Sequence, residues 1–335
     1  MTRGNLVEAK SRLEFIIASG TGSPYRLDAV YRSSLTGEVF PELGLYPIGS
    51  VNAEIVFGSP AGPPPETETD SIPFGCCGFF QPSFDLVEAF RTDANGLPAA
   101  GVVTNDFGLL SSDPFTPDVG PLDPRLDDSV GRRGVPYLDW GIHPGADWIL
   151  DQGYGGPYLP RKYVLSKSIL EGFFAPIRGV TGRNHVLLRF ADILLMQAEV
   201  EVEIGSLENA RFLVNQVRAR ATNPAGWTKR GDGSNAANYV IGLYNTPWVD
   251  KNLAREAVRI ERRIELSGEG ERFYDLVRWG IAAQVINAYL QSEGAKLPQA
   301  LGGASFTAGR DELYPIPQAE IDARAPGVLQ QNPGY

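Results

Sequence analysis

The strongest constraint on the fold is a pair of helix-forming segments that begins at about residue 187 and is joined by only two residues. Apolar side chains recur every three or four positions in both segments, which places them on one face of a helix. They are Leu187, Ala191, Leu194, Leu195, Ala198 and Val202 in the first segment, and Ala210, Leu213, Val214, Val217 and Ala221 in the second. Gly205 ends the first helix and Ser206 is a suitable N-cap for the second. We therefore expect an antiparallel helical hairpin of the tetratricopeptide kind.

Two further helices are expected after this hairpin, beyond a polar segment. Residues 223–245 are rich in Gly, Asn and Asp, which predicts a flexible connector. Asp250 is a suitable N-cap for the third helix. The apolar positions are Leu253, Ala257, Ile260 and Ile264 in the third helix, and Phe273, Leu276, Val277, Val285 and Tyr289 in the fourth. The predicted fold is mostly α, with tetratricopeptide-like helical hairpins and long irregular loops in a single domain over residues 1–335.

A dense cluster of charged side chains lies on the third and fourth predicted helices. It runs RIERRIE at residues 259–265 and continues at Glu269, Glu271, Arg272, Asp275 and Arg278. A catalytic interpretation would use two of these carboxylates as acid and base. Arginine predominates, however, and a guanidinium group holds a carboxylate in a bidentate pair and lowers its pKa. We therefore expect a structural ion network that ties two helices together.

The first 180 residues are less regular. Residues 1–60 predict one helix followed by an irregular segment, with a strand-like run at residues 52–57. Residues 61–180 are rich in Gly, Pro, Asp and aromatic residues, with dense turn signals. Long loops of this kind usually carry function on a rigid scaffold, so we expect the ligand face in this segment, followed by helical hairpins and a C-terminal tail over residues 185–335.

Three aromatic residues in the loop segment are candidate ligand-binding residues: Trp140, Trp148 and Tyr154. Gly and Pro residues surround them, and regular packing does not explain their presence. An aromatic ring offers an apolar face that the C–H face of a sugar can cover, while nearby amides and carboxylates bond its hydroxyl groups. The three residues therefore indicate passive sugar binding.

Composition and motifs exclude several other functions. The formal net charge of −10 argues against nucleic acid and against anionic lipid as partners. The sequence holds no run of about 18 apolar residues and no HExxH, CxxC, GxSxG, P-loop or GxGxxG motif. We therefore expect no metal, no cofactor and no enzymatic activity. The adjacent Cys76 and Cys77 are two thiols or a strained vicinal disulfide. The one enzymatic alternative is a glycosidase with two carboxylates drawn from Asp123, Asp127, Asp128, Asp139, Asp147 and Asp151.

Six stretches of the C-terminal half are distinctive: LRFADILLMQAE at 188–199, VNQVRARA at 214–221, ERRIEL at 261–266, GERFYDLVRWG at 270–280, LYPIPQAEI at 313–321 and QQNPGY at 330–335. In this order they resemble the SusD/RagB family of outer-membrane nutrient-binding lipoproteins. DPRL at 123–126 and the first helix are weaker matches. The resemblance implies tetratricopeptide-like hairpins whose irregular loops form the ligand face, and it implies no catalysis. It also implies an oligosaccharide ligand, a surface-exposed place at the outer membrane and a SusC-like TonB-dependent transporter as partner.

Two features depart from the family pattern. Members begin with a signal peptide and a lipid-bearing cysteine and have further N-terminal helices, so we expect this chain to be N-terminally truncated and to lack its lipidated anchor. Alternatives to glycan delivery are a peptide-binding or protein–protein interaction scaffold, which such hairpins commonly form, and a glycoside hydrolase. No motif transfers the family's ligand residues to positions of this chain.

Overall fold

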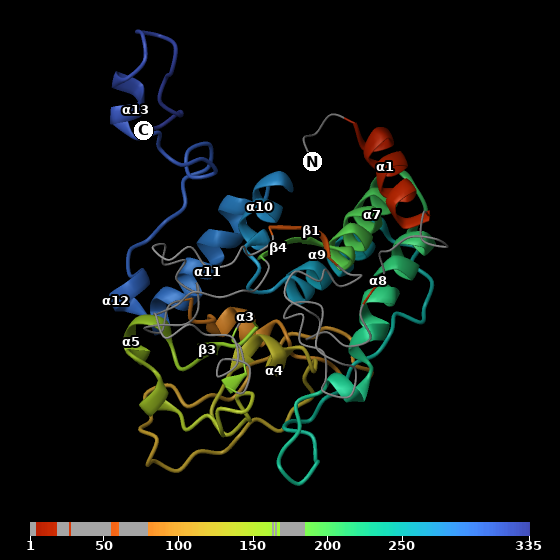
Figure 1. The fold of residues 1–335 in the computed structure, drawn as a ribbon, viewed down its shortest axis with the longest axis vertical. Coiled ribbons are helices and arrows are strands. Elements are labelled where there is room, and N and C mark those ends of the chain that lie inside the picture. The colour runs from red at the N-terminus through yellow and green to blue at the C-terminus, as the bar shows by residue number, and fades with distance from the viewer. Residues whose placement is uncertain are drawn as a thin grey trace. The chain divides into compact units, whose positions relative to one another are not determined.

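The computed structural model describes residues 5–18, 27, 55–59, 80–162, 164, 166–167 and 185–335 (Figure 1). The chain divides into two compact units, residues 1–269 and residues 270–335. The expectation of a single domain over residues 1–335 stays a prediction. The prediction for Cys76 and Cys77 lies outside the described residues.

Four helices of the first unit pack together as its helical region. They are α1 (Leu6–Ala18), α7 (Phe190–Ile204), α8 (Leu207–Ala221) and α9 (Lys251–Glu265). α7 packs against each of the other three. Gly205 and Ser206 alone connect α7 to α8, and the Ser206 hydroxyl accepts a hydrogen bond from the N–H of Asn209. The predicted helical hairpin is therefore confirmed.

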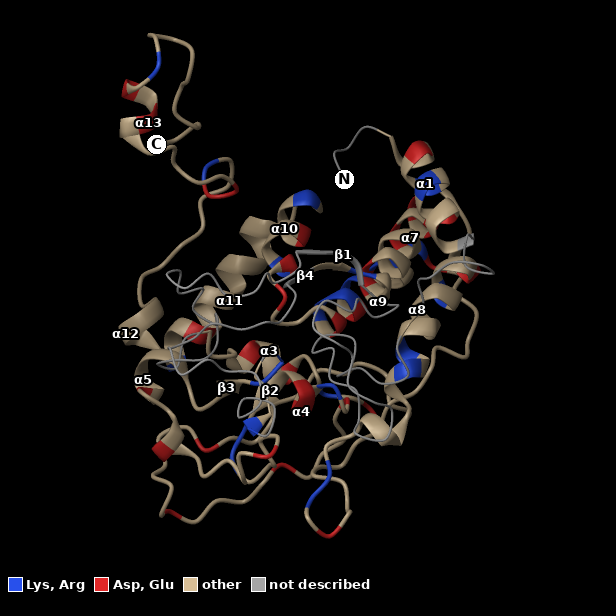
Figure 2. Cartoon of the chain, viewed as in Figure 1, with Lys and Arg blue, Asp and Glu red and all other residues tan. Residues whose placement is uncertain are grey.

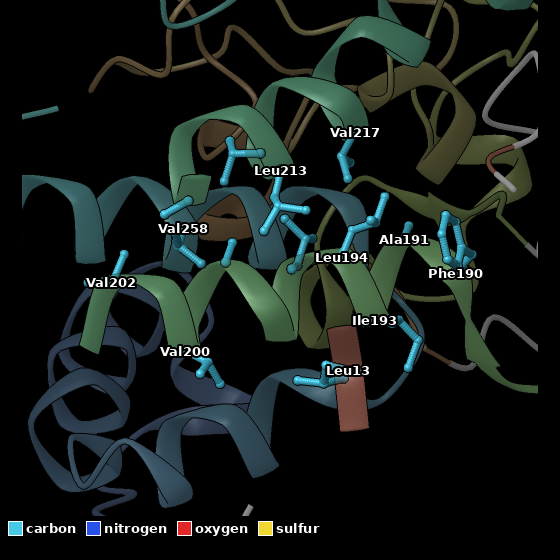
Figure 3. Packing of buried hydrophobic residues seen from close by; sticks show 14 of the residues in the cluster. Leu13, Phe190, Ala191, Ile193, Leu194, Val200, Val202, Leu213, Val217 and Val258 are labelled. Carbon is cyan, nitrogen blue, oxygen red and sulfur yellow. The ribbon is translucent and has the colours of Figure 1, made fainter. Parts of the chain in front are cut away.

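The apolar core lies between these helices (Figure 3). Ala191, Ala198 and Ala210 are fully buried, as expected where two helices approach closely. Larger side chains fill the space around them, among them Leu13, Leu194, Leu195, Leu213, Val214, Val217 and Val258. Each such side chain contributes about 1.5–3 kcal/mol when it is fully buried, so this cluster is the main apolar contribution to the stability of the unit.

The start of α7 differs from the prediction. Residues His185–Arg189 form β4, which pairs antiparallel with β1 (Ile55–Ser59), so the helix begins at Phe190 and not at Leu187. Leu187 is exposed. Apolar residues at 187 and 188 satisfy a strand pattern as well as a helix pattern, and pairing with β1 decides between them. The strand-like run predicted at residues 52–57 is confirmed in part by β1.

Two predictions for residues 223–265 need correction. The polar segment 223–245 packs against the loops instead of connecting helices freely. Tyr239 is buried, and the N–H of Val240 donates to the carbonyl of Leu122 at 2.9 Å. In α9 the predicted apolar residue Leu253 is exposed. The buried side of that helix combines apolar and charged residues: Ala254, Ala257, Val258, Glu261, Arg262, Ile264 and Glu265.

Residues 80–162 form the loop region, which consists mostly of turns, as predicted for this part of the chain. Its short elements are α3 (Phe84–Glu88), α4 (Leu126–Ser129), η3 (Ala146–Trp148) and α5 (Gln152–Gly155). A two-residue strand β2 (Val130–Gly131) pairs antiparallel with β3 (Leu159–Pro160). A short 3₁₀ turn, η4 (Pro224–Gly226), precedes Trp227, whose ring packs with Val135 and Tyr239 in a second small core.

The second unit contains α10 (Glu271–Arg278), α11 (Ala282–Lys296), α12 (Pro298–Leu301) and α13 (Gln318–Asp322). The predicted fourth helix is thus two helices, because the chain turns at Gly280 with a φ of +72°. The C-terminal residues fold back on the segment 313–317. Gln331 bonds both the N–H and the carbonyl of Ile316, at 2.7 and 2.9 Å, and Asn332 donates to the carbonyl of Tyr314.

Candidate functional site

Trp140 lies at the tip of a tight hairpin in the loop region. The N–H of His143 donates to the carbonyl of Val135 at 3.0 Å, and the N–H of Tyr137 donates to the carbonyl of Gly141 at 2.8 Å. These bonds fix the turn that carries Trp140, whose N–H donates to the Tyr137 carbonyl at 3.1 Å. Trp140 is 40% exposed, so its ring is accessible to solvent. The hydrogen bonds of the hairpin hold the backbone that carries this ring in place.

Trp148 lies on η3 and packs against two rings from that hairpin. Its ring centroid is 5.8 Å from that of Tyr137 and 5.4 Å from that of His143. His143 and Tyr137 are buried, whereas 37% of Trp148 remains exposed. One side of the indole is therefore supported by neighbouring rings, which fixes the orientation of the exposed part.

His143 is neutral in this setting. Its Nδ1 accepts a hydrogen bond of 3.0 Å from the N–H of Gly145, which leaves the ring proton on Nε2. Burial lowers the pKa of His143 to about 4. Nε2 has no hydrogen-bond partner, and neither does the buried Oδ2 of Asp106, which lies close to Gly145. Burial raises the pKa of Asp106 above its ordinary value, against the hydrogen bond to its own backbone and the attraction of Arg133.

Tyr154 lies on α5, whose first turn is capped by Asp151. Oδ1 of Asp151 accepts hydrogen bonds from the N–H groups of Gly153 and Tyr154, at 2.8 and 3.2 Å. Tyr154 is 61% exposed. At the other end of α5, the side chain of Gln81 donates to the carbonyl of Gly156 at 3.1 Å. Tyr154 is thus carried by a turn that is held at both ends.

One loop connects the surroundings of Trp148 and Tyr154. The N–H of Asp147 donates to the hydroxyl of Ser111 at 2.9 Å, and the N–H of Gly108 donates to Oε1 of Gln152 at 2.8 Å. Loop 105–111 is therefore bonded both to η3 and to α5. The Trp140 hairpin joins the same group through Tyr137, so the structure places the three predicted residues on adjoining loops.

Sequence analysis did not select Phe107, which also lies on this loop. Its ring is partly exposed and meets the buried ring of Phe84 edge-on, with centroids 5.3 Å apart. Phe84 in turn packs against Tyr158 at 5.7 Å. Phe107 stands beside Gly108, the same aromatic–glycine context that distinguished Trp140 and Tyr154, so this signal was present in the sequence.

A buried ion network joins the loop region to the helical region. Arg125 is 1% exposed, and its Nη1 donates to Glu261 at 2.7 Å and to Glu265 at 3.0 Å, both on α9. Its other nitrogens bind Asp123 in a bidentate pair at 3.0 and 2.8 Å. Glu261 also accepts from Arg218 of α8 at 2.8 Å. The predicted ion network is confirmed in part: its pairs are present, but they join α9 to α8 and to the loop region, whereas the prediction had them tie together the two helices that carry the cluster.

Glu265 and Lys162 extend this network. Glu265 accepts from Arg189 at 3.0 Å and pairs with Arg220 of α8. Burial would raise its pKa, but the surrounding guanidinium groups outweigh burial and hold the pKa far below its usual range. Nζ of Lys162 donates to the carbonyl of Glu265 at 2.8 Å and to Glu269 at 2.6 Å. Burial lowers the pKa of Lys162 to about 8, although Glu269 partly opposes the shift.

The carboxylates considered for glycoside hydrolysis fall into two groups. Asp123, Asp127 and Asp128 are buried and form ion pairs with Arg125, Arg132 and Arg161, respectively. Asp123 and Asp127 have no exposed surface, and Asp128 is only 5% exposed. Asp139, Asp147 and Asp151 are exposed. Across the described ranges, His, Cys, Asp and Glu form no group of three that could hold a metal ion.

Similarity to known proteins identifies the architecture. The sequence matches the SusD family (SusD_RagB) over residues 51–335, which is most of the chain. The chain belongs to the SusD family. It is 32% identical to SusD-like protein P2 of Formosa agariphila over 169 residues, which cover 48% of this chain and 29% of that protein.

Solved structures support the same conclusion at the level of the fold. A SusD-like carbohydrate-binding protein from Bacteroides fragilis matches with a TM-score of 0.59 and 22% identity, covering 94% of this chain and 60% of that one. Surface glycan-binding protein A from Bacteroides thetaiotaomicron, in complex with laminarihexaose, matches with a TM-score of 0.54 and 18% identity, covering 98% and 60%. The chain spans less than two thirds of the length of these relatives. The predicted tetratricopeptide-like, mostly helical fold is confirmed. Among the described residues, no helix has the length and apolar character needed to cross a bilayer.

Proposed function

We propose that this SusD-family chain binds oligosaccharides without chemically changing them. We further propose that it works at the surface of the outer membrane and passes its ligand to a SusC-like TonB-dependent transporter. Support for the ligand class comes from the two relatives described above, one named as a carbohydrate-binding protein and the other solved with laminarihexaose. The family resemblance supports the location and the transporter.

The observation that carries the proposal is the accessibility of Trp140, Trp148 and Tyr154 on loops that are otherwise well anchored. A sugar ring covers an aromatic face best when the ring is exposed and already oriented, because little conformational freedom is then lost on binding. Trp148 meets both conditions, since Tyr137 and His143 support one side of its indole. Carboxylates of the neighbouring Asp147 and Asp151 can accept hydrogen bonds from sugar hydroxyl groups.

Calorimetry against a panel of oligosaccharides, with laminarihexaose among them, tests the proposal. Trp148→Ala and Trp140→Ala should each weaken binding by about 1–3 kcal/mol if the rings stack on sugar. Phe212→Ala is the matched control, because Phe212 is an exposed aromatic residue on α8 in the helical region. Its substitution should leave affinity unchanged.

The ring assignment, the ligand class and the absence of catalysis each have a contrary outcome. Unchanged affinity in both tryptophan variants would refute their assignment, and binding of peptides alone would favour an interaction scaffold. Release of new reducing ends during incubation would show a glycosidase. For the transporter, a TonB-dependent transporter gene beside the gene for this chain is the expected finding, followed by co-purification of the two proteins.

A further inference from the structure

Two exposed aspartates flank the proposed binding rings. Asp147 immediately precedes Trp148, and Asp151 lies three positions before Tyr154. Both aspartates are exposed. Asp151 caps α5 through Oδ1, so its Oδ2 takes no part in the cap bonds. The structure gives the Asp147 carboxylate no ion pair among the described residues.

Most basic residues of the loop region are already paired with carboxylates in its interior. Residues 80–162 contain twelve Asp and Glu residues but only six Lys and Arg residues (Figure 2). Five of the six are buried and bonded to carboxylates: Arg91, Arg125, Arg132, Arg161 and Lys162.

The sixth basic residue, Arg133, is held by the backbone. It donates to the carbonyls of Ser111 and Asp113 at 2.8 and 2.7 Å, and its guanidinium group lies over the ring of Phe115. These carbonyls take up its donors but do not cancel its charge, which partly offsets the two aspartates because Arg133 and Asp147 both bond to Ser111. Burial keeps His143 uncharged at neutral pH, so the ring beneath Trp148 adds no positive charge.

Trp140 has a different electrostatic setting. The carboxylate of Asp139, which precedes it, accepts a hydrogen bond from the backbone N–H of Lys167. Lys167, whose side chain is exposed, carries the opposite charge to Asp139. We therefore confine the proposal below to the Trp148 and Tyr154 loops.

We propose that the surface formed by Trp148, Tyr154 and their flanking aspartates selects uncharged oligosaccharides and rejects glycans that carry carboxylate or sulfate groups. This inference rests on the proposed function and narrows its ligand class. An aromatic face binds neutral and acidic sugars alike, so the neighbouring charge decides between them. Each ligand anion within about 6 Å of Asp147 or Asp151 is expected to weaken binding roughly 3- to 10-fold at low ionic strength.

The test measures the affinity of the full chain for two sets of hexasaccharides by calorimetry at low salt. The neutral set contains β-1,3-glucan, β-1,4-glucan, β-1,4-mannan and β-1,4-xylan hexamers. The acidic set contains galacturonic acid, alginate and sulfated galactan hexamers. Binding confined to the neutral set is the expected result. Acidic ligands binding as tightly as neutral ones, or more tightly, would overturn the inference and leave the proposed function intact. No binding in either set would refute the proposed function itself.

A charge reversal separates a local effect from an effect of overall charge. Asp147→Lys should improve binding of the acidic hexamers by roughly tenfold at low salt, and this gain should shrink in high salt. Glu256→Lys is the matched control, since Glu256 is exposed on α9 and its substitution changes the net charge by the same amount. An equal gain in both variants would overturn the assignment to the Trp148 surface.

Discussion

The buried imidazole of His143 predicts a specific loss of stability in mild acid. Burial lowers its pKa from the ordinary value of 6.5 to about 4. In the unfolded chain the imidazole binds a proton below about pH 6.5, whereas in the folded chain it does so only below about pH 4. Between these values the unfolded state binds more protons, so the free energy of unfolding falls as the pH falls.

The expected magnitude follows from the separation of the two pKa values. A gap of about 2.5 corresponds to about 3 kcal/mol of unfolding free energy lost between pH 7 and pH 4. Asp106 has the opposite effect on stability. Its pKa is raised in the folded chain, so the folded chain binds this proton at a higher pH than the unfolded chain does and gains stability as the pH falls. Glu265, with its lowered pKa, adds to the loss at still lower pH. A comparison with a variant is therefore needed to isolate His143.

His143→Asn provides this comparison. Asparagine does not titrate, and its Oδ1 can replace Nδ1 as the acceptor for the Gly145 N–H. The variant should be less stable at pH 7 because the ring contacts with Tyr137 and Trp148 are lost. Its stability should nevertheless depend less steeply on pH, so the difference from the parent chain should shrink by about 3 kcal/mol by pH 4.

Urea unfolding followed by tryptophan fluorescence between pH 7 and pH 4 measures this difference. Four of the five tryptophans lie within residues 1–269, so the signal reports mainly on the unit that contains His143. If the parent chain and the variant lose stability in parallel over this range, the imidazole is not held neutral by burial and the reasoning fails.

Three further substitutions test the attachments of the loops and helices. Glu261→Gln should cost about 3–5 kcal/mol in urea unfolding because it leaves buried guanidinium groups without their charged partner, whereas Glu256→Gln on the exposed side of the same helix should change stability by less than about 0.5 kcal/mol. Gly145→Ala should lower the melting temperature, since the φ of Gly145 is +99° and a Cβ there would lie 2.7 Å from Oδ2 of Asp106. Gly231→Ala should leave the melting temperature unchanged, because the space around Gly231 is open. Asp250→Ala should cost about 1 kcal/mol, because Oδ1 caps the first turn of α9 with bonds of 2.7 and 3.2 Å, and full stability in this variant would contradict that role.

The helical hairpins could be predicted from the sequence because their signals are local. Apolar spacing, Gly205 and Ser206 lie within one stretch of chain and need no distant partner. The start of α7 could not be predicted in the same way, because it depends on β1, which is more than a hundred residues away in the sequence. Leu253 shows the same limit, since its spacing fits the helix but the buried side of α9 is determined by what packs against it.

For the buried charges, the sequence predicted that ion pairs form but not which residues form them. The alternating signs at residues 259–265 indicated fixed ion pairs, and the structure contains them. Their main partners, however, are Arg125 and Arg218, which no spacing rule connects to Glu261. For the candidate site, residue type and glycine context indicated Trp140, Trp148 and Tyr154, and their role in binding stays a prediction. Phe107 also lies next to a glycine, so the criterion of an aromatic residue in a glycine context would have selected it as well.

Buried charges attach the loop region to the helices. Arg125 is bonded at once to Asp123 of the loops and to Glu261 and Glu265 of α9. Removing any one partner leaves a buried charge uncompensated, so each attachment tolerates little change. The proposed binding rings, by contrast, are exposed and take no part in these pairs. The ion pairs that hold the loops and the rings proposed to bind the ligand are therefore separate, so Trp140, Trp148 and Tyr154 can be substituted without breaking those pairs.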